Sequence, residues 1–221
     1  MYGYVRMGRR GEAVRQRIGG IWLAAATVPE RGLLAPLRRR RIWRRLRKWG
    51  AVRCVLPRQL AAEAGRYGLL PVEVHRLRQA VLPQLLALQG DLRRQTAALR
   101  AAWVSPAVRE AAMVLAQQAR YLTLAVDSGG AALARELRER FGLSTGSRAA
   151  PAVTVSFGGA PAGAEICLGE DCQRYQQVTY QLRRGGNLLP WEQPEQLLAV
   201  LYECGEIKKE EICVKTIVSN A

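Results

Sequence analysis

The chain has 221 residues, 49% of them hydrophobic, so it is long enough to bury a core and too apolar for a disordered protein. It carries 34 Lys and Arg against 18 Asp and Glu, a formal net charge of +16, which bears on its binding partners rather than on its fold. No run of the sequence reaches the roughly 18–20 apolar residues that a transmembrane helix needs.

The positive charge lies at the front of the chain. Residues 1–60 contain sixteen Lys and Arg and two acids, a net charge of +14, whereas residues 61–221 contain eighteen against sixteen, a net charge of +2. The densest block, residues 37–49, is able to bind phosphate, an acidic protein or an anionic membrane. Arginine outnumbers lysine 30 to 4, so a genomic bias toward arginine is the alternative explanation of the charge.

The first predicted strand covers residues 21–28 and ends at Pro29. Four arginines between residues 9 and 17 precede this apolar run, so the segment also matches the outline of a signal peptide over residues 1–26. Short continuous apolar runs are typical of parallel strands, which favours the strand and leaves the signal peptide as the alternative.

Residues 35–49 are predicted to form a helix, because Pro36 lies near its start and Gly50 at its end. Residues 51–56 are the second predicted strand. Three helices follow, the second of them kinked at its internal proline, and they cover residues 58–67, 71–89 and 91–100.

Strands and helices continue to alternate up to residue 160. A short third strand, residues 101–104, precedes a helix that Ser105 caps and Pro106 opens. A strand, a helix and a further strand then cover residues 121–126, 131–141 and 152–157. Repeated β-α-β units of this length predict a parallel sheet with helices on both faces.

Beyond residue 160 the pattern changes to two short strands predicted as a meander, then a helix and a closing strand, over residues 165–168, 177–182, 194–204 and 212–218. We therefore predict the α/β class. Residues 1–160 form a Rossmann-like parallel sheet with helices on both faces, and residues 161–221 form a small β-rich C-terminal extension packed on it.

The cysteine content points to a reducing compartment. Five cysteines and one histidine, His75, are present, and no CxxC pair occurs. This set is poor for a Cys/His site, so no metal is predicted. An odd number of cysteines fits free thiols, and we expect a cytoplasmic protein.

The segment from Ala101 to Asp127 has the strand-turn-helix-strand order of a dinucleotide-binding unit, and Asp127 lies 22 positions after Ser105. In this general arrangement it resembles the Rossmann family, whose acid at this place holds the ribose hydroxyls. The turn departs from that family, because Pro106 removes an N–H and the glycines are missing. No nucleotide cofactor is therefore predicted, and the alternative is that Ser105 only caps a helix and Asp127 lies in a turn.

Ligands of doubly wound sheets bind outside the carboxyl ends of the strands. This rim supplies the predicted ligand-binding residues, which are able to hold an anion: Arg31, Ser105, Asp127, Ser128, Gly129 and Gly130. The rim contains no His, Cys or Lys and is poor for chemistry, so no catalytic residue is predicted and enzymatic activity stays open.

The basic block has an apolar side, because Ile42, Trp43, Leu46 and Trp49 lie within an arc of roughly 120° on a helix. One interpretation is a core-packing helix with both tryptophans buried and a solvated basic face. The other places the tryptophans on a membrane interface or against nucleic-acid bases. The residues predicted to bind a polyanion are Arg38, Arg40, Arg44 and Arg45.

The leading hypothesis is a non-catalytic cytoplasmic protein whose degenerate nucleotide-binding-type scaffold serves interaction or regulation. Its partner would be an acidic protein or, weakly and without specificity, nucleic acid. The first alternative is an enzyme or sensor that binds a nucleotide or phosphorylated metabolite at the strand carboxyl ends. The second is nucleic-acid binding through residues 37–49.

Overall fold

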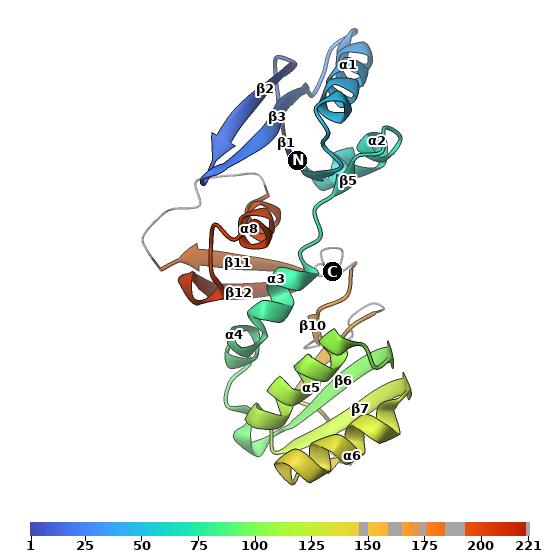
Figure 1. The fold of residues 1–221 in the computed structure, drawn as a ribbon, viewed down its shortest axis with the longest axis vertical. Helices are drawn as coiled ribbons and strands as arrows, with labels where there is room; N and C mark the ends of the chain where they lie inside the picture. The colour runs from blue at the N-terminus through green and yellow to red at the C-terminus, as the bar shows by residue number, and fades with distance from the viewer. Residues whose placement is uncertain (146–149, 159–164, 171, 173–175, 184–192, 220–221) are drawn as a thin grey trace. The chain divides into compact units, whose positions relative to one another are not determined.

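The computed structural model describes most of the chain, namely residues 1–145, 150–158, 165–170, 172, 176–183 and 193–219 (Figure 1). This part is mixed α/β, with two mostly parallel sheets flanked by helices and a small antiparallel pair near the C-terminus. No helix in the described ranges is long and apolar enough to cross a membrane. The chain divides into two compact units: unit 1 is residues 1–73 and 182–211, and unit 2 is residues 74–181 and 212–221.

Unit 1 is built on a sheet with the strand order β2-β3-β1-β4-β5. Its strands are β1 (Tyr2–Gly8), β2 (Glu12–Ile18), β3 (Ile21–Pro29), β4 (Arg53–Val55) and β5 (Leu70–Pro71). Only β2 runs antiparallel to its neighbour, and its turn to β3 consists of two glycines with positive φ, +54° at Gly19 and +96° at Gly20. Two such residues are what a tight hairpin turn requires.

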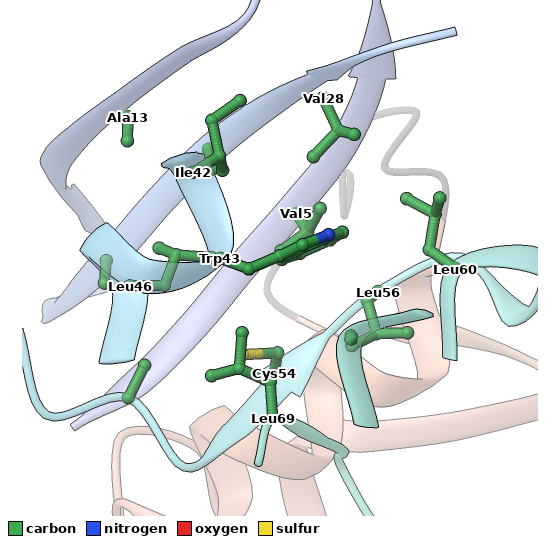
Figure 2. Close-up of a cluster of buried hydrophobic side chains, with 14 residues drawn as sticks. Val5, Ala13, Val28, Ile42, Trp43, Leu46, Cys54, Leu56, Leu60 and Leu69 are labelled. Carbon is green, nitrogen blue, oxygen red and sulfur yellow. The ribbon is translucent and has the colours of Figure 1, made fainter. Parts of the chain in front are cut away.

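The helices of unit 1 are α1 (Ala35–Lys48), the short α2 (Ala61–Gly65), and α8 (Pro194–Glu203) from the C-terminal part of the chain, with 3₁₀ turns η1 (Arg58–Leu60) and η3 (Lys209–Glu211). Helix α1 packs on β3 and β2. The cluster between them includes the fully buried Trp43 together with Val5, Ile42 and Leu46 (Figure 2). Alanines at positions 24 and 26 of β3 leave room for this large ring.

Unit 2 is built on an all-parallel sheet with the order β10-β9-β6-β7-β8. Its strands are β6 (Thr96–Trp103), β7 (Tyr121–Ser128), β8 (Ser144–Thr145), β9 (Val153–Ser156) and β10 (Glu165–Cys167). Counted in chain order, this is 5-4-1-2-3, the order of a doubly wound sheet, and it reverses between β6 and β9. Helices α5 (Pro106–Gln118) and α6 (Gly130–Phe141) cover one face of β6 and β7 (Figure 1).

The rest of unit 2 ties the C-terminal strands to the sheet. It comprises α3 (His75–Ala80), α4 (Leu82–Ala87), η2 (Leu92–Arg94), β11 (Gln176–Leu182) and β12 (Ile212–Ser219), of which β11 and β12 pair. Arg78 of α3 is fully buried, and its guanidinium donates to the carbonyl oxygens of Cys167, Cys172 and Gln176 at 3.4, 3.3 and 2.9 Å. The buried charge thereby satisfies three backbone acceptors at once.

Most predicted elements are confirmed. The strands predicted at residues 21–28, 51–56, 121–126 and 152–157 are β3, β4, β7 and β9, and all four take part in parallel pairs. The predicted helices over 35–49, from Ser105 and over 194–204 are α1, α5 and α8. The run considered as a signal peptide forms strand in this structure, ending β2 and making up β3.

The arrangement of these elements differs from the expected one in two ways. The parallel strands form two sheets rather than one, because the chain leaves the first sheet after β5 and starts a second at β6. Residues 161–221 are not one extension: β10 adds to the second sheet in parallel to β9, so residues 165–168 belong to no meander, and residues 182–211 belong to unit 1.

The helix predicted over residues 91–100 is wrong. Only η2 is helical there, and β6 begins at Thr96. The alanines and leucine of this segment favour helix in isolation, but residues 96–99 are all buried between neighbouring strands, and tertiary packing overrides local propensity.

Candidate functional site

The arginines of α1 divide into two groups. Arg39 belongs to the group that packs: its Nε donates to the carbonyl oxygen of Pro29 at 2.8 Å, and its guanidinium pairs with Glu63 at 3.1 Å. Glu63 also accepts the indole N–H of Trp43 at 3.0 Å. Arg47 donates to the carbonyl oxygen of Ala51 at 3.2 Å. These contacts hold α1 against α2 and the start of β4.

The second group is exposed and carries most of the charge. Among the described residues, none of its members forms an ion pair: Arg38, Arg40, Arg41, Arg44, Arg45 and Lys48. The sequence contains no acid between Glu30 and Glu63, so nothing within this segment neutralises them. The four arginines predicted to bind a polyanion all lie in this exposed group.

The basic surface extends from α1 onto the edge strand β2. The guanidinium carbons of Arg15 and Arg45 lie 5.8 and 4.7 Å from the ring centroid of Trp49, within the range of cation–π interaction. Arg17 lies directly opposite Trp22 in the β2-β3 register, and the Trp22 side chain is 64% exposed. Arg15 of β2 and Arg45 of α1 therefore lie beside the same aromatic ring, that of Trp49.

We define the arginine surface as the exposed cations of α1 and β2 other than Arg47, whose guanidinium is bonded to Ala51: Arg15, Arg17, Arg38, Arg40, Arg41, Arg44, Arg45 and Lys48. Its guanidinium groups present planar donor pairs that match phosphate oxygens. Sequence reasoning missed Arg41, whose position beside Arg44 and Arg45 was a usable signal, and the two arginines of β2. The alternation of exposed and buried residues in β2 is weak, since only its second and last residues are buried.

The tryptophans follow the core-packing interpretation in part. Trp43 is completely buried, whereas Trp49 is half-buried. Helix α1 thus packs its apolar side and leaves its basic side in solvent. The core-packing interpretation of residues 37–49 is confirmed for Trp43, which is therefore not available to a membrane interface or to nucleic-acid bases.

The ligand-binding residues predicted at the strand carboxyl ends are divided between the two units. Arg31 follows β3 in unit 1, whereas Ser105 and residues 127–130 lie at the carboxyl ends of β6 and β7 in unit 2. Ser105 caps α5, with its hydroxyl accepting from the N–H of Val108 at 3.2 Å. Asp127 and Ser128 are the last residues of β7 rather than a turn, and both are exposed.

The turn into α6 is built on glycine. Gly129 is the N-cap, with φ of +82°, and its carbonyl oxygen accepts the N–H of Leu133 at 3.1 Å. A side chain at Gly129 would be strained in this conformation and would approach Val104 within 3.1 Å. Gly129 and Gly130 thus allow the tight connection between β7 and α6.

The remaining titratable groups offer little chemistry. None of the five cysteines forms a disulfide, and burial raises the pKa of the Cys54 thiol to about 12, which keeps it neutral. Burial, followed by the hydrogen bond to Glu203, raises the pKa of Tyr2 to about 12. No group of three or more His, Cys, Asp or Glu within the described ranges is placed to hold a metal ion.

Comparisons with family models, with curated proteins and with solved structures give no match. The candidate sites are therefore the arginine surface of unit 1 and the strand carboxyl ends of unit 2.

Proposed function

We propose that this is a non-catalytic protein that binds a phosphate-rich polyanion through the arginine surface of unit 1. One observation carries the proposal. Six cations on successive turns of α1 are exposed, and none of them forms an ion pair with an acid in the described part of the chain. A polyanion neutralises several of them together and releases bound counterions, which is the main source of non-specific affinity for phosphate polymers.

The energetics of α1 support a role for this charge. Arg40 and Arg44, Arg41 and Arg45, and Arg44 and Lys48 are like-charged pairs four positions apart, and each pair costs about 0.2–0.5 kcal/mol of helix stability. A helix that only packed would be more stable with alternating charge. A bound anion converts each repulsive pair into a shared attraction.

The nucleotide alternative rests on the strand order of unit 2, which supports a Rossmann-like scaffold. The reversal point lies beside Ser105, where a phosphate would bind the first N–H groups of α5. Pro106 has no N–H, and the N–H of Val108 is already bonded to Ser105. We therefore infer a scaffold without a phosphate loop. Five cysteines without a disulfide support a reducing, cytoplasmic location.

The test is a salt series of binding to a labelled 20-nucleotide single-stranded DNA, followed by fluorescence anisotropy. We expect affinity to fall steeply with salt, with a slope of about 0.7 per phosphate neutralised. The variant Arg38/Arg40/Arg44/Arg45→Ser should lose most of the affinity and flatten the slope. Binding at high salt with no change in the variant would refute the proposal.

A matched control removes the same charge from the other unit. Arg93, Arg94, Arg120 and Arg135 are exposed arginines of unit 2, and their combined replacement by Ser lowers the net charge equally. If the control variant loses as much affinity as the α1 variant, general charge rather than the arginine surface accounts for binding.

A further inference from the structure

Three leucines are exposed where α1 begins. The side chains of Leu33, Leu34 and Leu37 are 101, 55 and 64% exposed. Leu37 lies one turn beyond the other two, so all three gather at one end of the helix. Single exposed leucines are ordinary on protein surfaces, but a group of three within five positions is not explained by packing within unit 1.

The leucines are not displaced core residues. The buried stripe of α1 runs through Ala35, Ile42 and Leu46, and Leu37 lies two positions after Ala35, on the opposite side of the helix. Helix α1 therefore has its own apolar side filled and carries a second, unpartnered apolar group on its basic side.

Arginines surround this group. Arg40 and Arg41 are the helical neighbours of Leu37 at three and four positions, and Arg38 stands four positions from Leu34. Arg31 precedes the leucines and is exposed; the one acid close by in sequence is Glu30, which is also exposed. An apolar group with arginines around it is complementary to a partner whose interior is apolar and whose surface is anionic.

We propose, building on the polyanion-binding function above, that the partner of the arginine surface is an anionic phospholipid membrane. Leu33, Leu34 and Leu37 insert below the headgroups, and the arginines of α1 pair with lipid phosphates while their aliphatic stems follow the leucines inward. Nucleic acid is the less suitable partner for this apolar group, because bases stack on aromatic rings and offer no apolar recess for leucine.

The location inferred from the thiols agrees with this partner. The cytoplasmic leaflet carries the anionic lipids, and each Lys or Arg near such a surface strengthens binding about fivefold. Free thiols fit the same compartment. Charge and insertion thus supply the two separate contributions that stable peripheral binding needs.

The experiment is co-sedimentation of the full chain with vesicles of phosphatidylcholine alone or with 30% phosphatidylglycerol, beside the DNA assay above. Of the two kinds of vesicle, we expect the chain to bind those that contain phosphatidylglycerol and not those of phosphatidylcholine alone. Leu33/Leu34/Leu37→Ser should weaken vesicle binding at least about tenfold and leave DNA binding unchanged. The control Val52/Leu70/Leu88→Ser, which replaces three other exposed apolar residues, should change neither.

The outcomes separate this inference from the proposed function. Equal vesicle binding by the leucine variant and the wild type overturns the inference. Binding to DNA with none to vesicles also overturns it and identifies nucleic acid as the partner, while the proposed function stands. Binding to neither polyanion at low salt overturns both. Far-ultraviolet circular dichroism of the leucine variant checks that the fold persists, as expected for exposed positions.

Discussion

Gln196 and Leu56, 140 positions apart, form a two-way hydrogen bond in the interior of unit 1. The side-chain oxygen of Gln196 accepts the N–H of Leu56 at 2.9 Å, and its amide nitrogen donates to the carbonyl oxygen of Leu56 at 3.2 Å. One side chain of α8 thus satisfies both backbone groups of the residue that follows β4. This contact explains why a late helix belongs to the first unit.

Replacing Gln196 by Leu should destabilise unit 1. Both groups are buried, and the change keeps the volume but leaves an N–H and a carbonyl without partners, which costs about 2 kcal/mol. Urea unfolding followed by tryptophan fluorescence measures the loss. The same change at the exposed Gln16 of β2 is the control and should cost little. An unchanged urea midpoint for the Gln196 variant would show that the contact is not formed.

The sequence reveals what is local and hides what is paired over distance. Helix α1 is predictable because its proline, its apolar stripe and its closing glycine lie within one segment. The strand β2 is not predictable in this way, because it lies at a sheet edge and four consecutive residues of its seven are exposed. The alternation of buried and exposed residues that marks a strand is therefore missing. The place of α8 in unit 1 depends on contacts such as that of Gln196 with Leu56, which no local pattern shows.

The candidate site follows the same division. Helical periodicity alone places Arg38, Arg40, Arg44 and Arg45 on the exposed side of α1. The stacking of Arg15 beside Trp49 requires β2 to lie along α1, and this packing becomes visible only in the folded chain. The strand-helix-strand order expected between Ala101 and Asp127 is present as β6, α5 and β7, but this order says nothing of a ligand.

Dinucleotides should not bind at the carboxyl ends of β6 and β9. Helix α5 offers a pyrophosphate few free N–H groups, because Pro106 has none and Ser105 occupies that of Val108. Differential scanning fluorimetry with 1 mM NAD or NADP should therefore shift the unfolding temperature by less than about 1 °C. Saturable stabilisation at micromolar concentration would mean that the turn accommodates phosphate after all.

The buried thiol of Cys54 should make unit 1 sensitive to alkali. Its pKa is about 12 in the folded chain and 9 when exposed, so the unfolded state releases its proton first as pH rises. The contribution of the neutral thiol to the free energy of unfolding is fully present below pH 9. It declines between pH 9 and 12, by at most about 1.4 kcal/mol per pH unit. Cys54→Ala lacks this contribution. The difference in unfolding free energy between wild type and variant should narrow or reverse from pH 8 to 11, and a constant difference would contradict the assignment.

Arg44→Glu should separate stability from binding. The change replaces two repulsions, with Arg40 and with Lys48, by two attractions at helical spacing, so the free energy of unfolding should rise by about 0.8–2 kcal/mol. Affinity for DNA and for anionic vesicles should fall severalfold, because a negative charge now stands in the middle of the arginine surface. Urea unfolding measures the expected gain in stability, and the two binding assays measure the expected loss of affinity in the same variant.

Two companion variants decide the cause of such a result. Arg44→Gln removes the repulsions without adding attractions, so its stability should lie between those of the wild type and the glutamate variant. Arg93→Glu changes the net charge equally but in unit 2, and should leave polyanion affinity close to that of the wild type. A charge kept only by genomic bias would behave differently: Arg44→Glu would gain stability with no greater loss of binding than Arg93→Glu. Only a surface selected for an anionic partner predicts a loss specific to α1.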